Sequence, residues 1–222
     1  MRELRSSNNI GDVRRFFRAW LSAPLRVAAI MPSGSALAGL ITSEISAATG
    51  PVIELGAGTG VFTRALIARG VPEDKLVLVE YGADFVQLLE QRFPRARILS
   101  ADAARLGEVE LFDDSDAGAV ISGLPLLSMP PRKVMAILDA AFSHLRSDGA
   151  FYQFTYGPRC PVPRVLLDRL ALKAIRIGGA LANVPPAAVY RIRRRPPRSV
   201  ISMRKTQSRG STGKRLLDLS EA

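Results

Sequence analysis

The sequence predicts an α/β fold in which helices cover both faces of a mostly parallel sheet of seven strands. Short apolar runs alternate with helix-forming segments along most of the 222 residues, and this alternation is typical of strands joined by crossover helices. A turn with glycines at 56, 58 and 60 lies where the first strand passes into a helix. A composition of 47% hydrophobic and 23% charged residues fits one globular domain with a full core.

The elements follow from local patterns in chain order. A helix is expected over 33–48, because Ser33 or Ser35 can cap it and Gly50 and Pro51 break the chain after it. Strands are then predicted at 52–55, 76–80, 97–100, 117–122, 150–156, 188–194 and 199–205. Helices are predicted between them at 61–69, 84–93, 131–145 and 162–173.

The net charge of +11 is concentrated at the two ends of the chain. Residues 1–26 carry +4 and residues 190–222 carry +8, whereas residues 27–189 carry −1. Cationic ends on a near-neutral domain indicate a polyanionic partner, either nucleic acid or an anionic membrane surface. The last residues, 206–222, are expected to form a basic tail.

Several classes of site and location are excluded by counting. The chain has one cysteine, Cys160, and one histidine, His144, which rules out an intramolecular disulfide and any site built from several cysteines or histidines. We therefore expect no metal. The longest apolar stretch, 25–41, is interrupted by charged and helix-breaking residues, and no signal peptide is recognisable. The expected location is the cytoplasm, at the inner face of the cell membrane.

A basic amphipathic helix is predicted within residues 1–26. Apolar residues recur there at spacings of three and four, with arginines beside them or on the other face. The helix either packs on its own domain with the arginines in water, or lies in a membrane interface. In the second case, the residues expected to contact the membrane are Arg14, Arg15, Phe16, Phe17, Arg18, Trp20 and Leu21.

The glycine turn carries the strongest chemical signal. A dinucleotide-binding turn would need glycine at 61, where this chain has valine, and would not need the acid at Glu54. This spacing of one acid and three glycines resembles motif I of class I S-adenosylmethionine-dependent methyltransferases. In those enzymes the turn accommodates the methionine part of the cofactor and the acid contacts it. The resemblance makes cofactor-binding residues of Glu54, Gly56, Ala57, Gly58 and Gly60.

Two more acids follow strands and extend this series. Glu80 ends the second strand, where a carboxylate can accept hydrogen bonds from both ribose hydroxyls. Tyr81 beside it is expected to line the adenine. Asp102 follows the third strand and is expected to accept a hydrogen bond from the adenine amino group, near the backbone amide of Ala103. Alone, each acid is equally compatible with a solvated side chain or a helix cap.

The loop after the fourth strand is the expected acceptor site. Enzymes that methylate exocyclic base nitrogens commonly carry an asparagine that accepts from the amine and an aromatic ring that stacks on the flipped base. Here the two positions are Gly123 and Leu126, so the base-reading groups are missing and a substrate with apolar parts is favoured. The Ser122 hydroxyl and the backbone groups of Gly123 and Leu124 are expected to orient the acceptor. Ser122 is also expected to contact the cofactor.

Four runs together identify a family resemblance: Met-Pro-Ser-Gly at 31–34, the glycine turn, Gly-Leu-Pro-Leu-Leu at 123–127 and Gln-Phe-Thr-Tyr-Gly-Pro at 153–158. They are similar to the small, soluble-type bacterial phospholipid N-methyltransferases, over roughly residues 10–195. The resemblance implies a Rossmann-like class I methyltransferase domain over 27–205, with S-adenosyl-L-methionine as cofactor and S-adenosyl-L-homocysteine as product. It adds Met31 and Ser33 to the cofactor contacts. Family members methylate phosphatidylethanolamine in up to three steps, toward phosphatidylcholine, at an anionic membrane surface.

The acceptor must lose a proton, because a lipid amine is mostly ammonium at neutral pH. No motif places His144 at the expected site, since it falls near the end of a helix away from the ligand-binding strand ends. Strand alternation puts Tyr152, Phe154 and Tyr156 on one face, and Tyr156 is the expected catalytic tyrosine, attracting the amine through its ring. The lipid phosphate is expected to meet Arg159, Arg191 or Arg193, unless these are solvated.

Two other functions remain compatible with the sequence. A ribosomal RNA adenine-N6 dimethyltransferase would use the basic ends on phosphates, but the fourth-strand loop lacks the base-reading residues. Residues 206–222 would also be too few for the C-terminal helical domain usual in that family. A module that binds S-adenosylmethionine or lipid without catalysis is the third interpretation. The main prediction therefore has a lipid and a membrane surface as partners, without nucleic acid.

Overall fold

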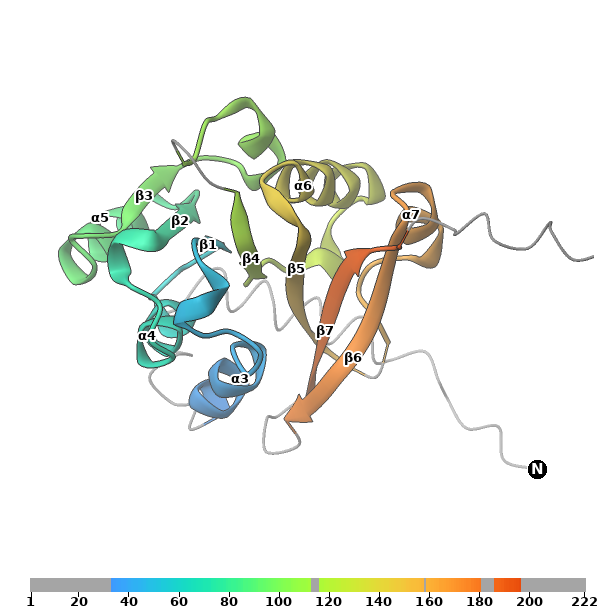
Figure 1. Ribbon diagram of the computed structural model, residues 1–222, viewed down its shortest axis with the longest axis horizontal. Coiled ribbons are helices and arrows are strands. Elements are labelled where there is room, and N and C mark those ends of the chain that lie inside the picture. The colour runs from blue at the N-terminus through green and yellow to red at the C-terminus, as the bar shows by residue number, and fades with distance from the viewer. Residues whose placement is uncertain (1–32, 113–115, 158, 181–185, 197–222) are drawn as a thin grey trace, which may run out of the picture.

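The computed structural model describes residues 33–112, 116–157, 159–180 and 186–196, which form one seven-stranded sheet covered by helices (Figure 1). The strand order is β3-β2-β1-β4-β5-β7-β6. Neighbours among the first five strands are parallel, and β7 is antiparallel to both β5 and β6. The strands are β1 (Val52–Leu55), β2 (Leu76–Glu80), β3 (Arg97–Ser100), β4 (Ala117–Ser122), β5 (Leu145–Tyr156), β6 (Leu172–Ala180) and β7 (Ala187–Arg194).

The helices form a layer on each face of the sheet. Helices α3 (Ser33–Ile41), α4 (Val61–Ala68) and α5 (Ala83–Arg92) cover one face, and α6 (Pro131–Ser143) and α7 (Arg164–Arg169) cover the other (Figure 1). Short 3₁₀ turns lie in the connections: η1 (Ala47–Thr49), η2 (Glu73–Lys75), η3 (Ala103–Glu108) and η4 (Leu126–Ser128). The predicted α/β class and the mostly parallel, Rossmann-like sheet are confirmed.

Two apolar clusters, one on each face, hold the sheet between its helices. Alternate residues of β1 divide between them: Ile53 faces α6, whereas Val52 faces α3, α4 and α5. The four residues of β1 are all buried, as expected for a central parallel strand that reads as a continuous apolar run. Burying a leucine or isoleucine side chain contributes about 1.5–3 kcal/mol. The central strands are therefore rigid supports for whatever lies at their ends.

The C-terminal third differs from the prediction. Only Arg164–Arg169 of the segment 162–173 is helical, and β6 begins at Leu172. Ala171 has a φ of 52°, a left-handed conformation that ends the helix and turns the chain into the strand. From there Leu172 and Ala174 pack on the core while Lys173 is exposed, a period of two that the sequence analysis missed.

Other boundaries differ by smaller amounts. The first helix ends at Ile41, well before the expected residue 48, and β5 begins at Leu145 and not at 150. The strand predicted at 199–205 lies outside the described residues, and β6 is the seventh strand of the sheet. The predicted N-terminal helix within 1–26 and the tail 206–222 also lie outside them.

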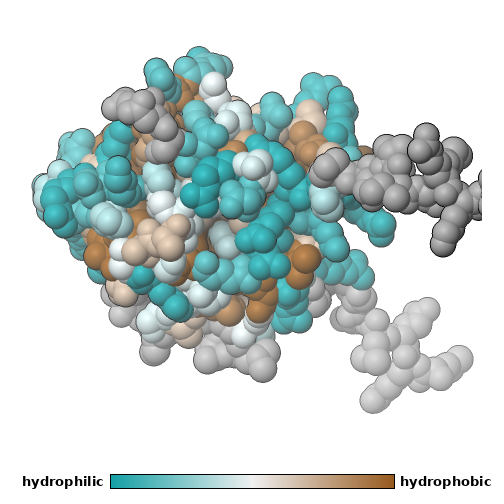
Figure 2. Space-filling view, in the orientation of Figure 1, coloured by the Kyte–Doolittle hydropathy of each residue, from teal (hydrophilic) through white to brown (hydrophobic). Residues whose placement is uncertain are grey.

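The surface in Figure 2 is mostly polar, with small apolar patches between charged side chains. Among the residues that the structure describes, large hydrophobic side chains that stay exposed are few and spread over the fold: Tyr81, Leu127, Val165 and Ile175. Within the ranges that the structure describes, no helix has both the length and the apolar character needed to cross a bilayer.

Candidate cofactor and acceptor site

The glycine turn between β1 and α4 adopts a backbone that only glycine takes readily. Gly56, Gly58 and Gly60 have φ values of 71°, 54° and 75°, all in the left-handed region. A Cβ at Gly60 would lie 2.3 Å from Cε2 of Phe93, so this position is closed by packing. A Cβ at Gly58 would meet nothing within 4 Å. The turn is thus fixed on its α5 side and open at its middle glycine, where a ligand can approach the backbone.

Glu80 ties the end of β2 to this turn. Its Oε2 accepts a hydrogen bond from the Gly58 amide at 2.9 Å, and its Oε1 accepts from the amides of Tyr81 and Gly82 at 2.8 and 2.9 Å. A carboxylate has about four acceptor positions, so one remains for a ribose hydroxyl, and not the two that were expected, because three backbone amides occupy the others. Tyr81 is 80% exposed beside it, where its ring is free to cover a bound base.

Glu54 is a buried carboxylate with one unsatisfied oxygen. Its side chain is 1% exposed, its Oε2 accepts from the Thr63 hydroxyl at 2.6 Å, and its Oε1 has no partner in the described part of the chain. Burial raises the pKa of Glu54 to about 8, although the Thr63 hydrogen bond opposes this shift. An unpaired buried oxygen costs about 1–3 kcal/mol. A bound group with an N–H donor or a positive charge would remove that cost.

Asp102 follows β3 and caps the turn η3. Its Oδ1 accepts from the Ala104 amide at 3.0 Å, and its Oδ2 pairs with Nζ of Lys133 at 2.8 Å. The Lys133 ammonium is the main reason that the pKa of Asp102 lies below its ordinary value. Ala103 is buried against the α6-side core. The sequence analysis did not predict Lys133, which comes from the first turn of α6.

The loop after β4 packs directly against the glycine turn. The Gly123 amide donates to the Leu55 carbonyl at 2.8 Å. A Cβ at Gly123 would lie 2.7 Å from the Gly56 carbonyl oxygen, and a Cβ at Gly56 would lie 2.8 Å from Cδ2 of Leu124. The predicted cofactor and acceptor segments are therefore in contact, and Gly123 has no room for a side chain.

Most polar groups of this loop are already paired. The buried Ser122 hydroxyl accepts from the Leu124 amide at 3.3 Å. The Leu124 carbonyl accepts from the Leu126 amide and from Nε2 of Gln153, both at 2.9 Å. Among the described residues, no hydrogen bond ends on the buried Gly123 carbonyl. Of the groups predicted to orient the acceptor, the Leu124 amide and carbonyl are paired within the loop, whereas the Gly123 carbonyl and the O–H donor of Ser122 are left available.

Aromatic residues from β5 and α4 line the α3 side of this sheet edge. The predicted common face of Tyr152, Phe154 and Tyr156 is observed. Phe154 packs edge-to-face against Phe62, with ring centroids 5.9 Å apart, and against Tyr156 at 5.6 Å. Burial raises the pKa of Tyr156, which keeps its hydroxyl neutral. Tyr152 lies deeper, where its hydroxyl donates to Glu44 at 3.1 Å.

Comparison with known proteins agrees with this geometry. The model of a family described as "Methyltransferase domain" matches residues 52–149. An ornithine lipid N-methyltransferase of Singulisphaera acidiphila is 30% identical over 143 residues, which cover 63% of this chain and 73% of that protein. The chain belongs to this family of bacterial lipid N-methyltransferases. It is a class I methyltransferase, and its cofactor is S-adenosylmethionine.

Two further comparisons are informative. The ribosomal RNA small subunit methyltransferase A of Brucella anthropi is 35% identical over 91 residues, or 38% of this chain, but the match spans only 33% of that enzyme. The solved DhpI–SAH complex shares the fold with a TM-score of 0.58 at 17% identity, covering 87% of this chain and all of that one. The sequence match to this RNA methyltransferase therefore spans about a third of each protein.

The residues present fit the cofactor of this family. When bound, S-adenosylmethionine supplies a sulfonium methyl group that an amine lone pair can take by direct displacement. Glu54 offers its unpaired oxygen, Gly58 leaves the turn open, and Glu80 and Asp102 follow the next two strands at the same sheet edge. This edge holds the carboxyl ends of the parallel strands, which is where ligands bind in open α/β sheets.

Other predicted residues lie away from this edge. Arg191 pairs with Glu44 at 2.6 Å, and Arg193 lies two residues farther along β7, so neither reaches the ends of β4 and β5. Arg159 is exposed in the loop after β5. His144 ends α6 at the opposite edge of the sheet, where its Nε2 lies 2.9 Å from the Leu106 carbonyl. Ser33 begins α3, whereas Met31 and the predicted membrane contacts lie outside the described ranges.

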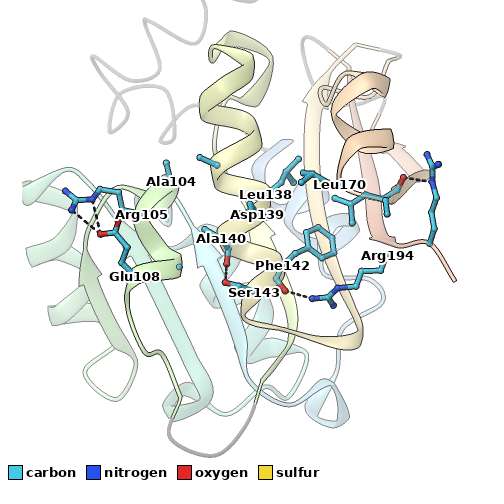
Figure 3. Close-up of a pocket in the computed structure, with 15 residues that line it drawn as sticks. Ala104, Arg105, Glu108, Leu138, Asp139, Ala140, Phe142, Ser143, Leu170 and Arg194 are labelled. Carbon is cyan, nitrogen blue, oxygen red and sulfur yellow. Dashed lines mark hydrogen bonds and ion pairs between the residues drawn. The ribbon is translucent and has the colours of Figure 1, made fainter. Parts of the chain in front are cut away.

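A separate groove of about 720 Å³ runs along α6, between η3 on one side and the α7–β6 connection and the end of β7 on the other (Figure 3). Arg194 lines this groove and donates to the Phe142 carbonyl. None of the predicted site residues lines it. In the same described ranges, no group of three or more His, Cys, Asp and Glu side chains could hold a metal ion.

Proposed function

We propose that this enzyme methylates the primary amine of a membrane lipid, with phosphatidylethanolamine as the substrate and stepwise mono-, di- and trimethylation toward phosphatidylcholine. The observation that carries the proposal is the β4 loop. Its Gly123 position has no room for an amide side chain, and Leu126 offers no ring for a flipped base. Such a loop suits a small flexible amine that a backbone carbonyl can hold better than a planar base.

The proposed mechanism uses position more than acid–base chemistry. In the first two steps, the Gly123 carbonyl accepts one N–H of the amine and holds the nitrogen lone pair in line with the methyl group. The dimethylated amine of the third step has no N–H once it is neutral, so the aromatic residues alone position it. Phe62, Phe154 and Tyr156 form an apolar wall, and desolvation beside it lowers the pKa of the ammonium. Because the Tyr156 hydroxyl stays neutral, this residue attracts the cation through its ring, worth about 0.5–2 kcal/mol. The proton leaves to water or to the lipid phosphate.

An ornithine lipid is the second candidate substrate, and the relative from Singulisphaera acidiphila favours it. It shares a primary amine with phosphatidylethanolamine, so the same carbonyl and aromatic wall would serve. The two lipids differ beside the amine, because phosphatidylethanolamine carries a phosphodiester. Arg159, exposed after β5, is the proposed phosphate partner, and its replacement should weaken only the phosphatidylethanolamine reaction.

The membrane contact is assigned to the N-terminal segment. Arg14, Arg15 and Arg18 would meet anionic lipid, while Phe16, Phe17, Trp20 and Leu21 would enter the interface. Each basic residue near an anionic surface adds about 1 kcal/mol. With the catalytic domain at 27–205 and the basic tail at 206–222, this arrangement would hold the enzyme on the inner face of the cell membrane.

The test is a product assay with radiolabelled S-adenosylmethionine. The protein is incubated separately with vesicles of phosphatidylethanolamine in phosphatidylglycerol, vesicles of an ornithine lipid in phosphatidylglycerol, and ribosomal RNA. We expect label in mono-, di- and trimethylated phosphatidylethanolamine. Label in the ornithine lipid alone would move the substrate to the second candidate. Label only in RNA would refute the proposal, and the basic ends would then be a nucleic-acid contact.

A further inference from the structure

Gln153 on β5 is a buried side chain that the proposed mechanism does not yet use. It is 1% exposed, and its Nε2 donates to the Leu124 carbonyl at 2.9 Å and to the Phe154 carbonyl at 2.8 Å. Both partners are acceptors, so the nitrogen must face them and the orientation of the amide is fixed. Gln153 therefore fastens the β4 loop to the end of β5 through both of its N–H groups.

The same orientation leaves Oε1 of Gln153 buried and without a partner in the described ranges. An unpaired polar atom stands out here because most of the neighbouring side chains on this face of the sheet are apolar. Gln153 pairs with Ser122 in the β4–β5 register. Two residues earlier in each strand, on the same face of the sheet, Val120 pairs with Phe151, and Phe151 also pairs with Ile192 of β7; all three are apolar and buried. A methionine at 153 would fill similar space without an unpaired oxygen. What the amide adds at this position is its hydrogen bond to the Leu124 carbonyl.

The hydrogen bond from Gln153 completes the pairing of the Leu124 carbonyl. The Leu124 carbonyl has two acceptor positions, and the Leu126 amide and Gln153 fill both. The Leu124 amide is held by Ser122, and the Gly123 amide by Leu55. The backbone groups on both sides of the Gly123 carbonyl are thus hydrogen-bonded, which holds this oxygen in a defined direction.

We infer that Gln153 is a positioning residue for methyl transfer: it clamps the β4 loop so that the Gly123 carbonyl is held in place for the acceptor amine. The inference rests on the proposed function, because it takes this carbonyl as the amine's partner. Gln153 acts through the loop and touches neither substrate nor cofactor. Loosening the clamp should reduce the rate of transfer and leave cofactor binding intact, since Glu54 and Glu80 are on other strands.

The experiment compares the full-length wild type with Gln153→Met and with the matched control Thr155→Val. Thr155 is a buried polar residue of the same strand and side, without a side-chain hydrogen bond to the β4 loop. In Gln153→Met we expect kcat on lipid vesicles to fall about 10- to 100-fold, with the dissociation constant of S-adenosylhomocysteine changed less than about threefold. Hydrogen exchange of the amides at 123–128 should quicken in Gln153→Met and not in the control.

A second variant keeps the test decisive where Gln153→Met fails to fold. Gln153→Glu has the same shape, but an ionised carboxylate cannot donate, and a protonated one donates a single hydrogen bond. The ratio of its kcat to that of the wild type should therefore rise as the pH falls through the range where the buried carboxyl gains its proton. A constant ratio would overturn the inference, as would a Gln153→Met enzyme with wild-type kcat and loop exchange. If the wild type methylates neither lipid, the proposed function fails, whereas loop exchange still tests the clamp.

Discussion

The burial of the Glu54 carboxyl group predicts how the stability of the cofactor-free protein changes with pH. Burial raises the pKa of Glu54 from 4.5 to about 8, so in the folded state this group keeps its proton over a range in which the unfolded chain loses it. The contribution of Glu54 to the free energy of unfolding is fully present below pH 4.5 and is lost as the pH rises to about 8. The loss is at most about 1.4 kcal/mol per pH unit, and about 5 kcal/mol over the whole range.

Glu54→Gln removes this dependence while keeping the shape of the side chain. Denaturant unfolding of the cofactor-free proteins should show the wild type losing stability relative to the variant from about pH 5 to about pH 8, and a constant difference above that. Thr63→Val is the matched second variant. It removes the hydroxyl that stabilises the ionised carboxylate, so the pH at which the loss levels off should move upward.

The same group couples cofactor affinity to pH. A ligand with positive charge favours the ionised carboxylate, so binding to the wild type should release a proton below about pH 8. By calorimetry, the dissociation constant of S-adenosylmethionine should fall up to about tenfold per pH unit in the wild type and level off near pH 8. In Glu54→Gln the dissociation constant should change less with pH, because the contribution of Glu54 is removed. The remaining pH dependence comes from the amino group of the ligand. Parallel pH profiles in the two proteins would refute the role given to Glu54.

Three further predictions concern the acceptor side and the membrane. Gly123→Ala should destabilise the fold by about 1–3 kcal/mol in denaturant unfolding, because its Cβ would lie 2.7 Å from the Gly56 carbonyl oxygen. Gly39→Ala, in a helix with nothing within 4 Å, should instead stabilise it by about 0.5–1 kcal/mol, and equal effects would contradict the packing argument. Tyr156→Phe should keep kcat within about threefold, since the ring is retained, and Tyr156→Ala should lower it about tenfold or more; a large loss in the phenylalanine variant would make the hydroxyl essential. Deleting residues 1–22 should abolish co-sedimentation with phosphatidylglycerol vesicles and leave cofactor binding unchanged, and undiminished sedimentation would remove the membrane role of this segment.

The central sheet could be predicted from the sequence because its strands are continuous apolar runs. Strands β1 to β4 begin and end where they were expected. For β1, β2 and β4 the reason is that they are buried and have no exposed face to blur the pattern, whereas the edge strand β3 is partly exposed. Strand β6 was missed, because the apolar residues around Leu167 and Leu170 continue into Leu172 and conceal the change of period at Ala171.

The cofactor side of the site was also within reach of the sequence, for a topological reason. Glu54, Glu80 and Asp102 lie in or just after consecutive parallel strands, and the carboxyl ends of such strands share one edge. The partners of these groups were not predictable. Lys133 reaches Asp102 from 31 residues away, Gln153 reaches Leu124 from 29, and Arg191 meets Glu44 across 147. Such pairs depend on strand register and helix placement, which local patterns do not contain.

We have proposed that the β4 loop presents a lipid amine, and not a base, for methylation. The most direct measurement is mass spectrometry of the products after the enzyme, S-adenosylmethionine, phosphatidylethanolamine vesicles and ribosomal RNA are combined in one reaction. We expect lipids with the masses of one, two and three added methyl groups and unmodified RNA. Methylated adenines in the RNA with an unchanged lipid would contradict it.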